Sequence, residues 1–174
     1  MYVEQVHIDT AALLLRMAFG ISIFVHGYNK IFGAGGLKST AKWFAKMGMR
    51  VPRLQARLAA LTELGAGIAL VIGFATPLAA AAVIALMIVA IVVTHRHNGY
   101  FIFRPGQGWE YCAAILSAAI VIALIGPGSW SLDSAIDLNY SNWVSLSIAI
   151  ALGFGSAVIQ LAIFWRPTTK VTSS

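Results

Sequence analysis

Five long runs of apolar residues constrain this chain more than any other feature of its sequence. Each run is about 16 to 23 residues long, close to the roughly 20 residues that an α-helix needs to cross the hydrocarbon core of a bilayer. A helix suits that environment because it satisfies its backbone hydrogen bonds internally. The chain of 174 residues is 59% hydrophobic and only 10% charged, unlike soluble proteins. We therefore predict an all-α, polytopic membrane protein whose helices occupy residues 10–32, 54–73, 77–94, 110–125 and 143–164.

The connections between these runs predict how the helices pack. The five residues GFATP join the second run to the third, which places those two helices antiparallel and side by side. The expected fold is a single transmembrane domain over residues 1–174, an antiparallel four-helix bundle with a fifth transmembrane helix at its edge. A short helix is expected at 40–47, where Lys42 and Lys46 share one face and Trp43 and Phe44 another. It either lies in the membrane interface or folds onto the bundle as an ordinary loop helix.

The net charge of +6 is distributed unevenly along the chain. Outside the first helix, the cations flank the first and third loops and the C-terminal segment. Four of the acidic residues lie instead near the N-terminus and in the fourth loop. By the positive-inside rule, this asymmetry places the N-terminus outside the cell and the C-terminus in the cytoplasm. The basic balance indicates orientation and attraction to anionic lipid in the bilayer, and no nucleic-acid partner is expected.

The first run carries ionisable side chains inside an apolar segment. Such groups are expensive in hydrocarbon, so they are expected to face other helices that supply partners. On a helix, two of these ionisable side chains and two glycines fall within one stripe about 80° wide. Glycines in the stripe let the backbone of a neighbouring helix approach closely. His26 lies on the flank of this stripe, whose members are Arg16, Gly20, Gly27 and Lys30.

Six polar residues of the predicted helices lie at a similar depth in the cytoplasmic half of the bundle. One hypothesis is a pocket for a quinone-like headgroup, in which histidine and lysine donate to the carbonyl oxygens and a carboxyl group exchanges the proton. The alternative is a structural network in which Lys30 pairs with Glu63 or Glu110 to avoid a lone charge in hydrocarbon. Within this set, His26, Lys30, Glu63 and Glu110 are expected to form one connected cluster. The full set of ligand-binding or proton-handling candidates is His26, Lys30, Glu63, His95, Glu110 and Tyr111.

Other chemistries are weaker interpretations of the same residues. His26 and His95 could ligate a haem from two helices, but a histidine at a helix end more often faces the surface. A zinc site from His95, His97 and Glu110 lacks compact ligand spacing, so no metal site is predicted. The lone Cys112 has no disulfide partner in the chain and is expected to be a small core residue.

Arg16 lies in the outer half of the first helix, too far from Lys30 to join the candidate cluster. Its expected partner is Asp133, at the outer end of the fourth helix. We predict a structural ion pair that locks the fold.

Several separated motifs resemble those of the DoxX family of small membrane proteins. The resemblance covers Leu13 to Asp133, and the fifth helix lies beyond it as an additional C-terminal helix. The matching segments are LLLRMAFGISIFVHGYNKIFG, LTELGAGIALVIGFATPLAA, HRHNGYF, GWEY and GPGSWSLD.

The resemblance implies a four-helix membrane bundle associated with redox physiology. Members of the family are linked to thiosulfate:quinone oxidoreductase and terminal-oxidase assemblies, and in actinobacteria to complexes with soluble antioxidant and sulfur-transferase proteins. Two functions remain open on this basis. The chain is either a quinone-interacting subunit of a membrane oxidoreductase, or a non-catalytic subunit that docks and stabilises a partner complex. The basic first loop and residues 143–164 are the expected contacts with a protein partner or a second copy.

Overall fold

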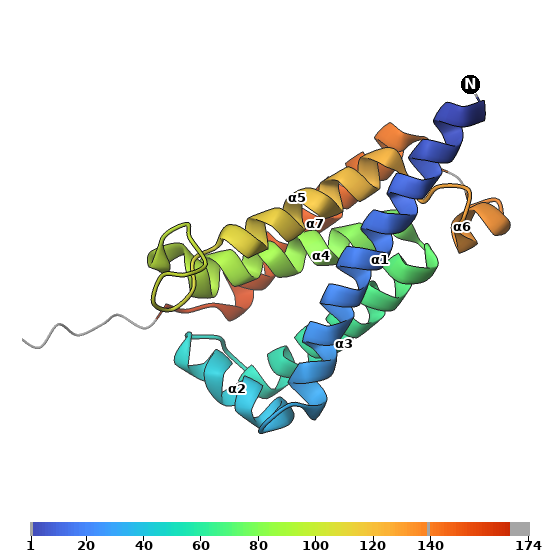
Figure 1. Cartoon of the computed structure of the whole chain (residues 1–174). Coiled ribbons are helices and arrows are strands. Elements are labelled where there is room, and N and C mark those ends of the chain that lie inside the picture. Colours follow the sequence, from blue (N-terminus) through green and yellow to red (C-terminus); the bar gives the residue numbers. More distant parts are fainter. Residues whose placement is uncertain (1, 139, 168–174) are drawn as a thin grey trace, which may run out of the picture.

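The computed structural model describes residues 2–138 and 140–167, and every regular element in this part of the chain is helical (Figure 1). The all-α fold class predicted from the apolar runs is confirmed. In chain order the elements are α1 (Tyr2–Phe32), α2 (Gly36–Lys46), α3 (Pro52–Ile72), α4 (Thr76–Ala90), the π-helical turn η1 (Ile91–His95), the 3₁₀ turn η2 (Arg96–Asn98), α5 (Glu110–Ile125), α6 (Leu132–Ala135) and α7 (Asn142–Phe164).

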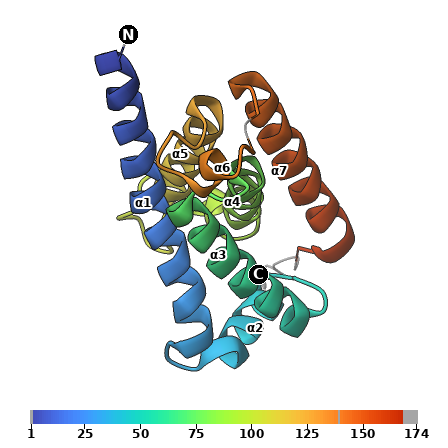
Figure 2. The same cartoon turned by 90° about the vertical axis from the view of Figure 1, so that its right-hand side faces the viewer.

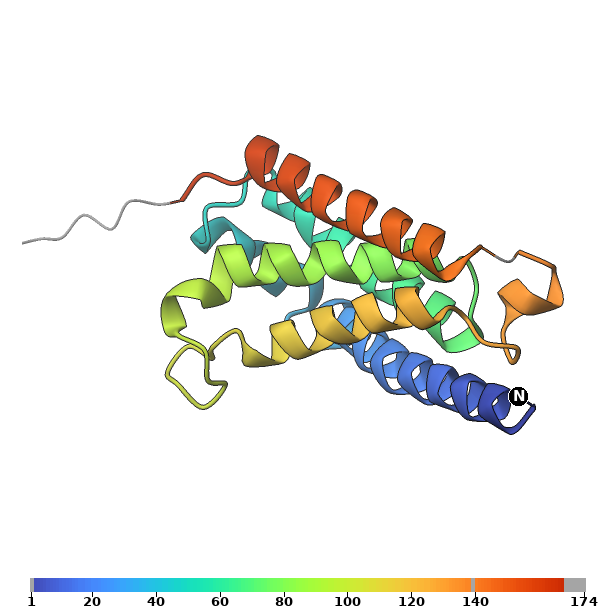
Figure 3. The same ribbon diagram turned by 90° about the horizontal axis from the view of Figure 1, so that it is seen from above.

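Four described segments are long and apolar enough to cross a membrane: Glu4–Phe32, Pro52–Ile72, Thr76–Asn98 and Asn142–Phe164. The helix α5 is also apolar but has only 16 residues, a length of about 24 Å. It packs beside α4, as the view from above shows (Figure 3), and it also contacts α7. The chain is therefore a multi-pass membrane protein built as a helical bundle.

Several observed elements differ from the expected ones. The helix α1 begins at Tyr2 instead of near residue 10, because its first polar turns continue the helix beyond the apolar stretch. The third run extends through η1 and η2 to Asn98. The short helix α6 was not expected from the sequence, and its first turn is capped by the Ser131 hydroxyl, which accepts a hydrogen bond from the Ser134 N–H.

Glycines bring the backbones of α1 and α3 into direct contact. A Cβ atom added at Gly67 would lie 2.6 Å from the Phe24 nitrogen and 2.8 Å from the Gly20 oxygen, so no side chain fits there. A Cβ at Gly27 would lie 2.8 Å from the Leu64 nitrogen. Small residues allow this close crossing, which holds the α1 stripe predicted from the sequence against α3.

We predict that Gly67→Ala destabilises the protein while Gly65→Ala does not. The added methyl group at residue 67 meets backbone atoms that cannot move aside, which should cost about 1 to 3 kcal/mol. Gly65 lies on the same helix with nothing within 4 Å of an added Cβ, and alanine favours a helix over glycine. Thermal unfolding in detergent measures both variants. Equal melting temperatures for the two would contradict the proposed crossing.

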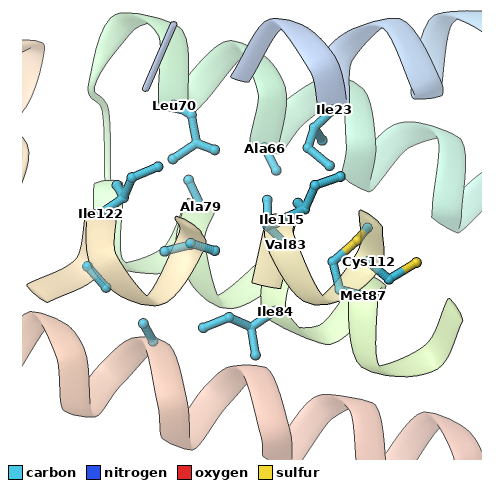
Figure 4. Packing of buried hydrophobic residues seen from close by; sticks show 14 residues of the cluster. Ile23, Ala66, Leu70, Ala79, Val83, Ile84, Met87, Cys112, Ile115 and Ile122 are labelled. Carbon is cyan, nitrogen blue, oxygen red and sulfur yellow. The ribbon is translucent and has the colours of Figure 1, made fainter. Parts of the chain in front are cut away.

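The helix α4 lies at the centre of the bundle, with α3, α5 and α7 packed around it. Figure 4 shows buried side chains from these helices meeting along α4, among them Val83 and Ile84. Cys112 is fully buried in this core, as expected for a small core residue. Gly153 of α7 packs tightly on α4, because a Cβ added there would lie 2.6 Å from the Ile84 side chain.

The two ends of the bundle differ in structure (Figure 2). At one end, which we call the α2 end, α2 crosses near the last turn of α1 and the start of α3. The other end holds the N-terminus and the loop between α5 and α7, and we call it the N-terminal end.

The loop between α5 and α7 fastens the N-terminal end together. The Asp133 carboxylate accepts hydrogen bonds from the N–H groups of Ala75 (2.7 Å) and Thr76 (2.9 Å), at the start of α4. The fully buried Arg16 donates from Nη2 to the Trp130 carbonyl oxygen at 2.6 Å. Both side chains are described, and no contact within 4 Å pairs their charges directly. Arg16 and Asp133 therefore interact electrostatically without direct contact. Each side chain hydrogen-bonds to backbone groups at the N-terminal end of the bundle.

Candidate functional site

A cavity of about 560 Å³ lies in the half of the bundle nearer α2, between α3, α4 and α7. We call it the α3–α7 cavity. Its size is within the range of small-molecule sites, which are commonly about 300 to 1,000 Å³. Most of its wall is apolar. Side chains that form this wall include Leu58, Leu86, Val89, Val93, Ile159 and Phe164.

The arrangement of the helices explains why a cavity forms here. Both α3 and α7 pack on α4, but they hardly contact each other (Figure 2). At the α2 end, backbone hydrogen bonds tie the end of α7 to the α2–α3 connection: the Arg50 N–H donates to the Phe164 oxygen at 2.7 Å, and the Arg166 N–H to the Gly48 oxygen at 2.9 Å. The helix α7 is thus held at both α4 and the α2–α3 connection, and the space between it and α3 remains open.

A buried ion pair provides one polar part of this region. Lys30, in the last turn of α1, places its Nζ 2.6 Å from both carboxylate oxygens of Glu63 on α3. The side chains are 20% and 7% exposed, and Lys30 lines the cavity. Glu63 and Glu110 are both possible partners of Lys30 by sequence, and the structure pairs Lys30 with Glu63. An ammonium group has three hydrogens, so Lys30 retains a donor beyond those shared with the carboxylate.

A histidine–tyrosine pair forms a second polar part of the cavity wall. His95 ends the π-helical turn η1 and is only 5% exposed. Its Nδ1 lies 2.9 Å from the Gln107 carbonyl oxygen, and its Nε2 lies 3.0 Å from the Tyr111 hydroxyl of α5. A carbonyl oxygen only accepts, so the proton of neutral His95 is on Nδ1 and Tyr111 donates to Nε2. Glu63 is close enough to interact electrostatically with Tyr111, which links the two polar parts.

The loop 99–109 supports His95 from outside the bundle. Asn98 donates from Nδ2 to the carbonyl oxygens of Gly106 (2.7 Å) and Gln107 (3.1 Å), and the second of these also accepts from His95. Glu110 accepts a hydrogen bond from the Ile102 N–H at 3.0 Å. Asn98 and Glu110 thus fix the path of the loop, and the loop fixes the orientation of the imidazole.

The structure therefore divides the six candidate residues. Lys30, His95 and Tyr111 line the cavity, and Glu63 is bonded to Lys30. Glu110 bonds to its own loop, and His26 is exposed on the surface of α1. A haem between His26 and His95 does not fit this arrangement, because both ring nitrogens of His95 already face Gln107 and Tyr111. His97 bonds to its neighbour Arg96.

An amide pair across the cavity was missed by sequence reasoning. Gln160 of α7 donates from Nε2 to Oε1 of Gln55 on α3 at 2.8 Å, and both residues line the cavity. Gln55 is 1% exposed, and its own Nε2 is buried without an acceptor among the described residues. A buried donor without a partner is costly and needs an explanation, such as a bound ligand. The available signal was Gln160, a strongly polar residue in an otherwise apolar run.

These features define a class of protein, a multi-pass helical membrane protein with a partly open cavity that combines apolar walls and a polar cluster. The model of the DoxX family matches residues 11–96, and the chain belongs to that family. The matched region holds Lys30, Glu63 and His95, whereas Tyr111, Gln160 and the whole of α7 lie beyond it.

Two bacterial proteins are similar to this chain over much of their length. Inner membrane protein YphA of Escherichia coli (strain K12) is 29% identical over 125 residues, which cover 70% of this chain and 86% of that protein. Putative oxidoreductase CatD of Bacillus subtilis (strain 168) is 29% identical over 125 residues, which cover 72% of this chain and 86% of that protein. No solved structure matches the chain at a significant level.

The Lys30–Glu63 pair yields a prediction about stability. Lys30→Met and Glu63→Gln should each destabilise the protein by about 3 kcal/mol, because each leaves the other charge buried without its partner. The double variant should recover most of this loss. Thermal unfolding in detergent gives the comparison, with Lys46→Met at an exposed position as the control for loss of one lysine. A double variant no more stable than the single variants would show that the two charges are not coupled.

Proposed function

We propose that this DoxX-family membrane protein binds a quinone-like ligand in the α3–α7 cavity as a subunit of redox metabolism. The proposal rests on one observation: the wall of the cavity is mostly apolar, and side chains from four helices add hydrogen-bond donors to it. A quinone has the matching chemistry, an apolar tail and ring with two carbonyl acceptors. The Bacillus subtilis relative is named a putative oxidoreductase, which supports a role in redox metabolism.

Each polar group has a role in this proposal. The remaining hydrogen of the Lys30 ammonium group donates to one carbonyl oxygen of the ligand. The single hydrogen of the Tyr111 hydroxyl goes to Nε2 of neutral His95, and it becomes available to the ligand when His95 takes up a proton at Nε2. The unpartnered Nε2 of Gln55 donates to an acceptor in the part of the cavity that α7 closes. Glu63 and His95 hold their partners in place and accept or supply protons when the ligand changes its protonation state. The proposal assigns binding and proton handling to this chain, and the electrons come from a partner oxidoreductase.

We expect Tyr111→Phe to weaken binding of a quinone about 10-fold, because it removes one hydrogen bond while retaining the ring. Gln55→Leu should have a similar effect. The measurement is quenching of tryptophan fluorescence by decylubiquinone or menadione, with the full chain in lipid nanodiscs. Tyr28→Phe is the matched control, because Tyr28 is exposed on α1 and does not line the α3–α7 cavity.

Two outcomes would contradict the proposal. The first is the absence of saturable quenching in the wild-type protein. The second is an equal affinity in Tyr111→Phe, Gln55→Leu and Tyr28→Phe. A protein that purifies without quinone but with a stable partner would favour the alternative function, a non-catalytic subunit that docks and stabilises a complex. The exposed aromatic residues Tyr100, Phe101 and Phe103 of the loop 99–109 favour that alternative as a contact surface.

We further propose that the α2 end lies in the cytoplasm of a bacterial cell and the N-terminal end outside its plasma membrane. The positive-inside rule supports this orientation, since the cations of the first loop gather at α2. The Escherichia coli relative is named an inner membrane protein.

Cysteine labelling tests the orientation. Lys46→Cys and Arg104→Cys, at exposed positions, should react with a membrane-impermeant maleimide only after the cells are opened. Ser129→Cys at the N-terminal end should react in intact cells. The native Cys112 is buried and serves as the silent background. Labelling of residue 46 or 104 in intact cells would reverse the assigned topology.

A further inference from the structure

A second hollow, separate from the α3–α7 cavity, lies between α2 and α3 at the α2 end. Its volume is about 500 Å³, and apolar residues such as Leu37, Ala41 and Pro52 form part of its lining. Cations from both helices complete the lining. We call this hollow the basic groove, after its charged residues Lys38, Lys42, Arg53 and Arg57.

The charges of the basic groove are uncompensated within the described part of the chain. No ion pair or hydrogen bond involves the side chains of its four cations, and all four are exposed. Of the acidic residues outside the N-terminal end, Glu63 is bonded to Lys30 and Glu110 to the Ile102 N–H. The remaining acids of the sequence lie at the N-terminal end, namely Glu4, Asp9, Asp133 and Asp137.

The spacing of these cations favours an anion in the groove. Lys38 and Lys42 are four residues apart on α2, and Arg53 and Arg57 are four residues apart on α3. Like charges at this spacing face the same side of a helix and repel each other. A phosphate group relieves the repulsion, and the planar guanidinium group of arginine binds two phosphate oxygens at once.

An apolar stripe leads away from the groove along α3. Leu61 lies one helical turn beyond Arg57 on the same face, and its side chain is 62% exposed. Ile68 continues this face about two turns further and is also exposed. A ligand that follows both features carries a phosphate at one end and hydrocarbon at the other. We propose that the basic groove binds the headgroup of an anionic phospholipid, whose acyl chain lies along the α3 stripe.

Lipid retention in detergent tests this proposal with the full chain. The purified protein is titrated with dioleoyl phosphatidylglycerol or dioleoyl phosphatidylcholine, and bound lipid is counted by native mass spectrometry. The wild-type protein should retain phosphatidylglycerol in preference to phosphatidylcholine. Arg53→Gln combined with Arg57→Gln should lower the affinity for phosphatidylglycerol about 10-fold or more.

A matched variant separates the groove from general surface charge. Lys46→Gln combined with Arg50→Gln removes the same charge from the same end, at residues that do not line the groove. It should retain phosphatidylglycerol nearly as well as the wild-type protein. Equal losses in the two double variants would overturn the groove as the site. Melting temperatures near that of the wild type show that both variants are folded, as expected for exposed side chains.

Two further probes separate a lipid from a free anion. Inorganic phosphate and glycerophosphoglycerol carry the phosphate chemistry without acyl chains, and at millimolar concentration neither should displace the lipid. Displacement by either, or equal retention of phosphatidylcholine, would overturn the proposal of a phospholipid site. The proposal does not depend on the quinone-like ligand, because the groove and the α3–α7 cavity have different lining residues.

Discussion

A charged group in hydrocarbon must find a partner, and the Lys30–Glu63 pair meets this constraint for the half of the bundle that holds the cavity. The pair joins the last turn of α1 to α3, and its short contacts require the two helices to cross closely. Gly27 and Gly67 make that crossing sterically feasible. Because α3 and α5 both pack against α4, side chains of α4 and Tyr111 of α5 line the same cavity as Lys30. The candidate site thus depends on one electrostatic requirement and on the small residues that allow it to be met.

Much of the fold could be predicted from the sequence for a simple physical reason. The length of an apolar run is matched to the thickness of the membrane, so the runs predicted a helical membrane protein, and the structure has four helices long enough to span a bilayer and the shorter apolar α5. The cost of a buried charge likewise singled out Arg16, Lys30 and Glu63. These two signals act along one helix at a time. They indicate which residues must be buried but not which neighbouring helix will cover them.

The features that could not be predicted depend on how several helices come together. The sequence placed Glu110 with Lys30, because both have a suitable depth, yet a loop N–H at Ile102 is the partner that Glu110 contacts. His26 shares the depth of the cluster but lies on the exposed side of α1. The helix α7 was expected to be an edge helix available to a partner, and it also forms one wall of the cavity. The match to the family model ends at residue 96, so this wall belongs to the part of the chain outside that match.

The contact between His95 and the Gln107 carbonyl oxygen limits where the imidazole can gain a proton. With Nδ1 committed to that carbonyl, a second proton can arrive only at Nε2, the atom that accepts from Tyr111. Once Nε2 is protonated, it becomes a donor, and the Tyr111 oxygen must then accept from it. The phenolic hydrogen is released from the histidine and is free to turn toward the cavity. A single proton on His95 would therefore reverse the direction of the hydrogen bond and present a new donor to whatever molecule occupies the space between α3 and α7.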